Sequence, residues 1–169
     1  MARQLVRGER QYARVSVFPF LLPYSKMRTS ALLLSAALVL GGCQPQPTVR
    51  IGFIGGLSDR YADLGSPAKH AVELAVAERN AAGGINGRTI ELWSRDDFQD
   101  ESIAKEAFQD LVQLGVAGIV GPMTSSMAVT LAPLADAAQR VIISPTAVTS
   151  ELSGRDDHFF RVLPSADEY

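Results

Sequence analysis

From residue 49 onward, short apolar runs alternate with segments in which apolar residues recur every three or four positions. The short runs favour buried strands, and the periodic segments favour helices with one packed face. Strands are predicted over 49–55, 89–93, 116–120, 141–143 and 159–162. Helices are predicted over about 66–81, 102–114 and 127–138. Strands that alternate with helices predict parallel β-α-β units, and therefore an open, doubly wound α/β sheet.

Residues at the ends of these segments support the boundaries. Gly83-Gly84 is expected to end the first helix, because glycine adopts the left-handed conformation that a helix end requires. Ser102 is expected to cap the second helix at its N-terminus. The packed face of that helix is predicted from residues spaced four, four and three apart, namely Ile103, Ala107, Leu111 and Leu114.

Open α/β sheets bind ligands at the carboxyl ends of their strands. Three hydroxyl residues, Thr124, Ser125 and Ser126, lie between the third strand and the third helix. Free N–H groups at a helix N-terminus attract anions, and the hydroxyls add further donors. One of the hydroxyls can equally serve only as the helix cap. The pattern therefore predicts a candidate polar site and leaves the capping alternative open.

Charge separates the beginning of the chain from the rest. Residues 1–42 carry six basic side chains and one acidic one, whereas residues 43–169 carry ten basic and seventeen acidic ones. The whole 169-residue chain has a net charge of −2, so its composition does not point to nucleic acid as a partner. The basic head and the acidic body are therefore interpreted separately.

The head contains a ten-residue apolar run, 31–40, that follows Met27-Arg28. As a helix this run would measure roughly 15 Å, about half of a membrane's hydrocarbon core, so it is too short to span one. A short apolar run behind positive charge is typical of a secretory signal peptide. We interpret 27–42 as that peptide and 1–26 as a misassigned N-terminal extension.

The apolar run ends at Leu40-Gly-Gly-Cys43, which contains the only cysteine of the chain. This stretch resembles the lipobox of bacterial lipoproteins. The resemblance implies cleavage before Cys43, a diacylglycerol on its sulfur, and a Pro-rich tether over 43–48. The alternative is an apolar helix that contains a cysteine by chance.

Other chemistries find little support in the sequence. Gly52–Gly56 matches neither of the glycine-rich nucleotide loops. Asp96-Asp97 has no accompanying ligand cluster, so a solvated turn is favoured over a metal site or an acid pair. Ser125 lies outside a G-x-S-x-G motif, and no spacing connects it with a histidine. We therefore expect no cofactor, no metal and no enzymatic activity.

An ordered set of segments carries a family resemblance: 51–58, 75–87, 96–97, 121–126 and 143–152. Together they resemble the type I periplasmic binding proteins, in the leucine/isoleucine/valine-binding branch that serves ABC importers. The resemblance implies two α/β lobes that close on a small ligand. Residues 49–169 would form an incomplete first lobe, because the family is more than twice as long as this segment.

The resemblance also implies a set of ligand contacts. Ser125 would bind the ligand's head group, and the carbonyl of Thr146 would accept from an ammonium. Val148 stands where the family has a threonine, which Thr149 could replace by a register shift, and Leu64 stands where an aromatic residue covers the ligand. The expected contact residues are Thr124, Ser125, Ser126, Thr146, Ala147, Val148, Thr149 and Leu64. The two departures leave a branched-chain amino acid, an amide or another small carboxylate open as the ligand.

The resulting expectation is a lipid-anchored receptor of the bacterial cell envelope, facing the periplasm or the exterior, that delivers a small molecule to an ABC permease. The alternative is a ligand-sensing domain of a receptor or amide-type regulator on the same fold. A Rossmann-type enzyme comes third, because the nucleotide fingerprint is missing. An incomplete lobe is expected to bind ligand weakly or not at all, and to expose apolar surface on its sheet.

Overall fold

The computed structural model describes residues 47–168, which lie in a compact unit that spans residues 46–169. The proposed extension, the signal peptide, Cys43 and most of the tether lie outside these residues and stay predictions. Five strands are described: β1 (Val49–Gly55), β2 (Ile90–Asp96), β3 (Gly118–Val120), β4 (Ile142–Ser144) and β5 (Phe159–Arg161). The α-helices are α2 (Ala62–Ala81), α3 (Glu101–Gln113) and α4 (Ser125–Ala137). Within this part of the chain, no helix is long and apolar enough to cross a membrane.

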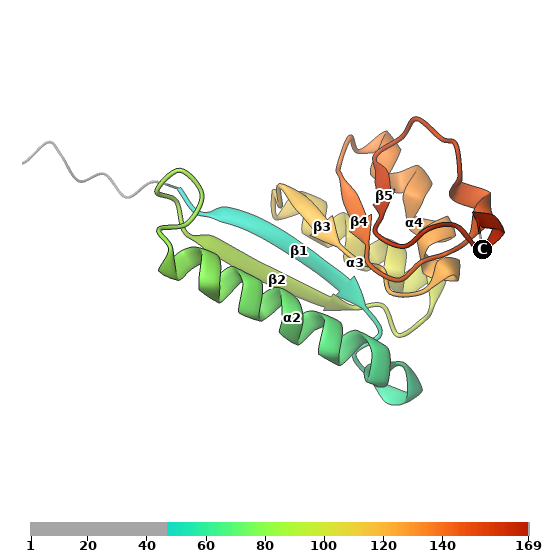
Figure 1. Ribbon diagram of the computed structural model, residues 1–169, viewed down its shortest axis with the longest axis horizontal. Helices are drawn as coiled ribbons and strands as arrows, with labels where there is room; N and C mark the ends of the chain where they lie inside the picture. Colours follow the sequence, from blue (N-terminus) through green and yellow to red (C-terminus); the bar gives the residue numbers. More distant parts are fainter. Residues whose placement is uncertain (1–46, 169) are drawn as a thin grey trace, which may run out of the picture. The chain divides into compact units, whose positions relative to one another are not determined.

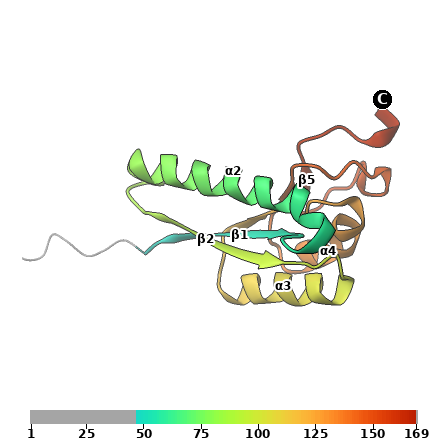
Figure 2. The ribbon, with the colours of Figure 1, turned by 90° about the horizontal axis from the view of Figure 1, so that it is seen from below.

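The strands form one parallel sheet in the order β2-β1-β3-β4-β5. Helix α2 lies over one face of β1 and β2, and α3 lies over the opposite face (Figures 1 and 2). The buried core lies between the sheet and the pair α3 and α4, where Ile54, Leu111, Ile119 and Leu131 are at most 2% exposed. The predicted doubly wound α/β architecture is therefore confirmed.

Two helix starts differ from the prediction. Helix α2 begins at Ala62, following a short 3₁₀ turn over Asp59–Tyr61, instead of near residue 66. The cap of α3 is Asp100 and not Ser102, because the Asp100 carboxylate accepts from the amides of Ser102 and Ile103 at 2.8 and 3.0 Å. A carboxylate also complements the positive end of the helix dipole, so aspartate is the stronger cap at this position.

The face of α3 that packs against the sheet is rotated from the predicted one. Ala107 and Leu111 are buried as expected, but Ile103 is 38% exposed. Ala104 and Phe108 are buried in its place. The buried face of α3 includes two small alanines, Ala104 and Ala107, which let the helix pack closely through the neighbouring face.

The second half of the sheet exposes an apolar face, as expected for an incomplete lobe. Val120, Ile143 and Phe160 are adjacent partners across β3, β4 and β5. Ile143 and Phe160 are 43% and 53% exposed. Val120 lines a hollow together with residues of α2, so these residues lie on the side of the sheet that α2 covers at β1 and β2. We call the residues Val120, Ile143 and Phe160 the apolar stripe.

Candidate functional site

The segments that follow β3 and β4 meet at the N-terminal end of α4. The backbone N–H of Val148 donates to Oγ of Ser125 at 3.2 Å. Parallel strands end at the same edge of a sheet, and β3 and β4 are direct neighbours. The structure therefore brings together the two segments in which the sequence predicted ligand contacts.

Further hydrogen bonds fix the two segments against each other. The hydroxyl of Thr146 donates to the carbonyl of Met123 at 2.5 Å, and the buried hydroxyl of Ser144 donates to the carbonyl of Pro122 at 2.6 Å. Oγ of Ser144 also accepts from the amide of Ala147 at 3.1 Å. The proton of the Thr146 hydroxyl is thus engaged within the protein.

The remaining predicted contact residues take up different environments. Ala147 is fully buried in the core, backbone included, and its amide donates to Ser144, so its predicted role as a ligand contact is not supported by its position. Thr149 caps a 3₁₀ turn over Ser150–Leu152 by accepting from the amide of Glu151 at 3.2 Å. Leu64 is 42% exposed near the start of α2, the helix that follows β1 at the same edge of the sheet.

A polar hollow of about 350 Å³ lies beside the start of α4. Its lining is about as apolar as it is polar, and it combines hydroxyls with two carboxylates. The residues are Glu101, Ser125, Ser126, Val129, Thr130, Thr149 and Glu151. Such a mixture of directed polar groups suits the recognition of a small polar solute. Three of the predicted residues, Ser125, Ser126 and Thr149, line this hollow.

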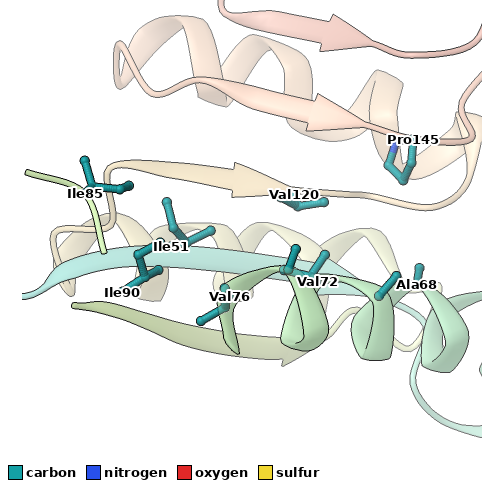
Figure 3. Close-up of a pocket in the computed structure, with 10 residues that line it drawn as sticks. Ile51, Ala68, Val72, Val76, Ile85, Ile90, Val120 and Pro145 are labelled. Carbon is teal, nitrogen blue, oxygen red and sulfur yellow. The ribbon is translucent and has the colours of Figure 1, made fainter. Parts of the chain in front are cut away.

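A larger hollow of about 450 Å³ lies between α2 and the sheet (Figure 3). Its walls are almost entirely apolar, with Val72 and Val76 from α2 facing Ile51 of β1 and Val120 of β3. Val120 also belongs to the apolar stripe, so this hollow continues onto the uncovered sheet face. It offers very little polar surface to orient a solute, so its lining suits apolar groups better than a polar ligand.

The acidic pair that follows β2 is not the solvated turn that the sequence favoured. Asp97 is fully buried, and its Oδ2 has no hydrogen-bond partner among the described residues. Asp96 is half-buried and accepts from the amides of Leu57 and Phe98, each at 2.9 Å, and from the hydroxyl of Ser58 at 2.5 Å. The pair therefore ties the loop after β1 to the loop after β2.

Burial acts on both carboxyls, but the net shifts are opposite. Burial is the largest influence on Asp97 and raises its pKa above 3.8, although Gln99 donates to it twice. Burial also acts to raise the pKa of Asp96, but the bonds from Ser58, Leu57 and Phe98 together outweigh it and lower that pKa. Among residues 47–168, no cluster of three or more potential metal ligands accompanies the pair.

Sequence reasoning missed Asp97 and Gln99 as parts of this edge. Nε2 of Gln99 donates to Oδ1 of Asp97 at 2.9 Å, and Oε1 of Gln99 accepts from the Thr124 hydroxyl at 2.7 Å. The available signal was the position of the pair directly after a buried strand. Nothing in the pattern distinguishes a buried carboxyl there from an exposed one.

Known proteins are similar to this chain in both sequence and fold. The Leu/Ile/Val-binding protein homolog 8 of Brucella suis biovar 1 (strain 1330) is 31% identical over 147 residues, covering 83% of this chain. The alignment covers 36% of that relative, so this chain spans about a third of its length.

Two solved structures resemble the described fold. One is the branched-chain amino acid transporter substrate-binding protein LivJ from Streptococcus pneumoniae in complex with isoleucine, with 34% identity and a TM-score of 0.67. The match covers 70% of this chain and 34% of LivJ. The other is a solute-binding protein of an ABC transporter from Rhodopseudomonas palustris BisB5 in complex with 3,4-dihydroxybenzoic acid, with 25% identity and a TM-score of 0.62. That match covers 70% of this chain and 32% of the other.

The sequence profile of one family matches residues 48–169, which include every strand and helix described above. The match agrees with the resemblance found in the sequence and with the structural similarity to both solved proteins. The chain belongs to the family of periplasmic binding proteins.

Proposed function

We propose that this chain is part of an extracytoplasmic receptor that binds a small polar solute and delivers it to an ABC importer. Its role is binding without chemical conversion of the solute. The expected contacts are the N-terminal end of α4 and the segment that follows β4. The permease, and the lobe that would close over the ligand, are partners that this proposal implies.

The contact between Ser125 and Val148 carries the proposal. Oγ of Ser125 accepts from the Val148 amide, so the Ser125 proton remains to be donated outward. The first-turn amides of α4 point the same way, and together these donors match an anionic group such as a carboxylate. The Thr146 carbonyl would supply an acceptor for a cationic or amide group of the same ligand.

The ligand class follows from the relatives and from the local chemistry. LivJ is in complex with isoleucine, and the Rhodopseudomonas palustris protein is in complex with 3,4-dihydroxybenzoic acid. Both ligands carry a carboxylate, which the donors at α4 would receive. We therefore propose a small carboxylate as the ligand. Branched-chain amino acids are candidates because LivJ is in complex with isoleucine, and a carboxylate without an ammonium is the alternative because Val148 has no hydroxyl for one.

Calorimetric titration of the 169-residue chain with L-isoleucine, L-leucine and 3,4-dihydroxybenzoate tests this function. Because the described residues provide only one wall of the site, we expect a dissociation constant in roughly the millimolar range, about −4 kcal/mol. Ser125→Ala should weaken that binding roughly fivefold, the effect of losing one hydrogen bond.

Ser102→Ala is the matched control, because Ser102 is an exposed serine near the start of α3. The function would be contradicted if Ser125→Ala and Ser102→Ala bound these ligands equally well. Micromolar affinity for an amino acid would overturn the expectation that an incomplete lobe binds weakly.

We also propose that Cys43 anchors the mature protein to a membrane through a diacylglycerol. Several acyl chains would hold it firmly, since each buried CH₂ contributes about 0.8 kcal/mol. Cells that express the chain with a radioactive fatty acid should label it, and Cys43→Ala should remove the label. Processing should also stop in the presence of globomycin. If the parent chain took up no fatty-acid label, the proposed lipid anchor at Cys43 would be contradicted.

A further inference from the structure

Thr124 occupies the capping position of α4 but does not cap it. Its backbone has the extended conformation of an N-cap (φ −114°, ψ 153°), yet its side chain makes no capping hydrogen bond. A threonine at this position normally accepts from the second or third amide of the helix. The Thr124 hydroxyl instead donates to Oε1 of Gln99 at 2.7 Å. The first-turn amides of α4 therefore lack their usual side-chain partner.

The orientation of Gln99 follows from its neighbour Asp97. Oδ1 of Asp97 accepts from both the backbone N and the side-chain Nε2 of Gln99, each at 2.9 Å. Because that oxygen accepts, the Gln99 amide must turn its NH₂ toward Asp97 and its carbonyl toward Thr124. Asp97 is fully buried, so this anchor is shielded from water.

The backbone adds to the constraint on Gln99. Phe98 and Gln99 are two consecutive residues in the left-handed region, with φ of 48° and 53°. This conformation is unfavourable for residues other than glycine and persists where the surroundings fix it. The hydrogen bonds to Asp97 are the contacts that hold Gln99 there.

We propose that Gln99 is a positioning residue: it draws the Thr124 hydroxyl away from the end of α4 and so keeps the first-turn amides open for an anionic group of the ligand. This inference rests on the proposed ligand site at α4. The loop after β2 would thus influence ligand binding through Thr124, without contacting the ligand itself. Removing the Gln99 carbonyl should let Thr124 rotate and cap the helix.

The neighbouring hydroxyls fit this arrangement. Oγ of Ser126 lies 3.3 Å from the Thr124 hydroxyl oxygen. Since the Thr124 proton is donated to Gln99, Ser126 must be the donor in that contact. The oxygen of Ser125 accepts a hydrogen bond from the Val148 amide, so the Ser125 proton is free to be donated to a ligand. The open end of α4 thus presents backbone N–H groups and the Ser125 O–H as donors, beside the carboxylates of Glu101 and Glu151 that line the adjacent hollow.

Amide hydrogen exchange in the ligand-free 169-residue chain tests the positioning role directly. Gln99→Met keeps the length of the side chain but removes the acceptor for Thr124. We expect exchange at the Ser126 and Met127 amides to slow by roughly three- to tenfold, the effect of one capping bond. Adding Thr124→Val should return exchange to the rate of the parent, because no hydroxyl remains to cap.

Two further variants separate this role from general stabilisation. Thr124→Val alone should leave the exchange rates of the Ser126 and Met127 amides unchanged. If Thr124 were an ordinary cap, the same substitution would accelerate their exchange. Gln113→Met, at an exposed glutamine in the last position of α3, is the matched control and should also change nothing. The inference is overturned if Gln99→Met leaves exchange unchanged or faster, or if the double variant keeps it slow.

Binding of L-isoleucine provides the functional readout. Gln99→Met should weaken binding by roughly three- to tenfold, and the double variant Gln99→Met/Thr124→Val should restore it. A loss that the second substitution does not restore contradicts the positioning role. If exchange responds as expected while Ser125→Ala binds L-isoleucine as well as the parent does, the proposed function fails and the orientation of Thr124 stands.

Discussion

Gly65→Ala is expected to lower the free energy of unfolding by about 3 kcal/mol, the upper range for overpacking a close contact. Gly65 is buried in α2, and a Cβ at this position would lie 1.9 Å from the backbone oxygen of Gly56. Neither atom can move alone, because Gly56 directly follows β1 and its backbone is part of the turn that leads to α2. Chemical denaturation, with the midpoint and slope compared between variants, measures the change.

This expected loss of stability is opposite to the usual effect of replacing glycine by alanine inside a helix. Alanine inside a helix is normally more favourable than glycine by roughly 0.5–1 kcal/mol. Ser66→Ala, at the next position of the same helix, is the matched control and should change stability by less than about 0.5 kcal/mol. An unchanged or raised midpoint for Gly65→Ala would mean that α2 does not pack against the turn at Gly56 as described.

Asp97→Asn is expected to gain stability relative to the parent as pH rises from about 4 to about 7. The folded-state pKa of Asp97 is raised above 3.8, mainly by burial, so the unfolded chain releases this proton first. The contribution of the protonated carboxyl is therefore fully present below the unfolded pKa and is lost as pH rises through the folded one. Each unit by which the pKa is raised corresponds to about 1.4 kcal/mol.

Asp96→Asn is the matched control for this prediction, because the pKa of Asp96 is lowered below 3.8. Its contribution to stability is present above the unfolded pKa and is lost as pH falls through the folded one. The Asp96 variant should therefore approach the parent only in acid, while the Asp97 variant departs from the parent toward neutral pH. Parallel stability curves for Asp97→Asn and the parent would contradict the burial that raises the pKa of that carboxyl.

Local patterns were sufficient to predict the architecture. Apolar runs such as those at β1 and β4 indicate strands, and the periodic segments between them indicate helices. A helix that connects two strands of one sheet places those strands parallel, so the alternation leads to a parallel sheet. The rule that ligand sites lie at the carboxyl ends of strands predicted the edge of the sheet where the site lies, whereas Ser125 and Val148 were assigned as contacts through the family resemblance. These inferences depend on short stretches of sequence or on general topology.

Features that depend on three-dimensional packing were not predictable in the same way. Asp97 and Asp96 look alike in the sequence. Only the surrounding turns decide that Asp97 is fully buried with one oxygen unpartnered, while both oxygens of Asp96 accept hydrogen bonds. The link from Gln99 to Thr124 joins residues 25 positions apart. A hydrophobicity pattern contains no information on such a pairing, which arises when the loop after β2 folds over the start of α4.

The central claim is that a ligand meets this chain where β3 and β4 end, at the start of α4. Amide chemical shifts of the 169-residue chain, recorded while L-isoleucine is added, test that placement directly. Saturable changes should be largest at Ser125, Ser126 and Val148. Changes concentrated instead at Val72 and Val76, beneath α2, would show that the apolar hollow receives the ligand and would contradict the account.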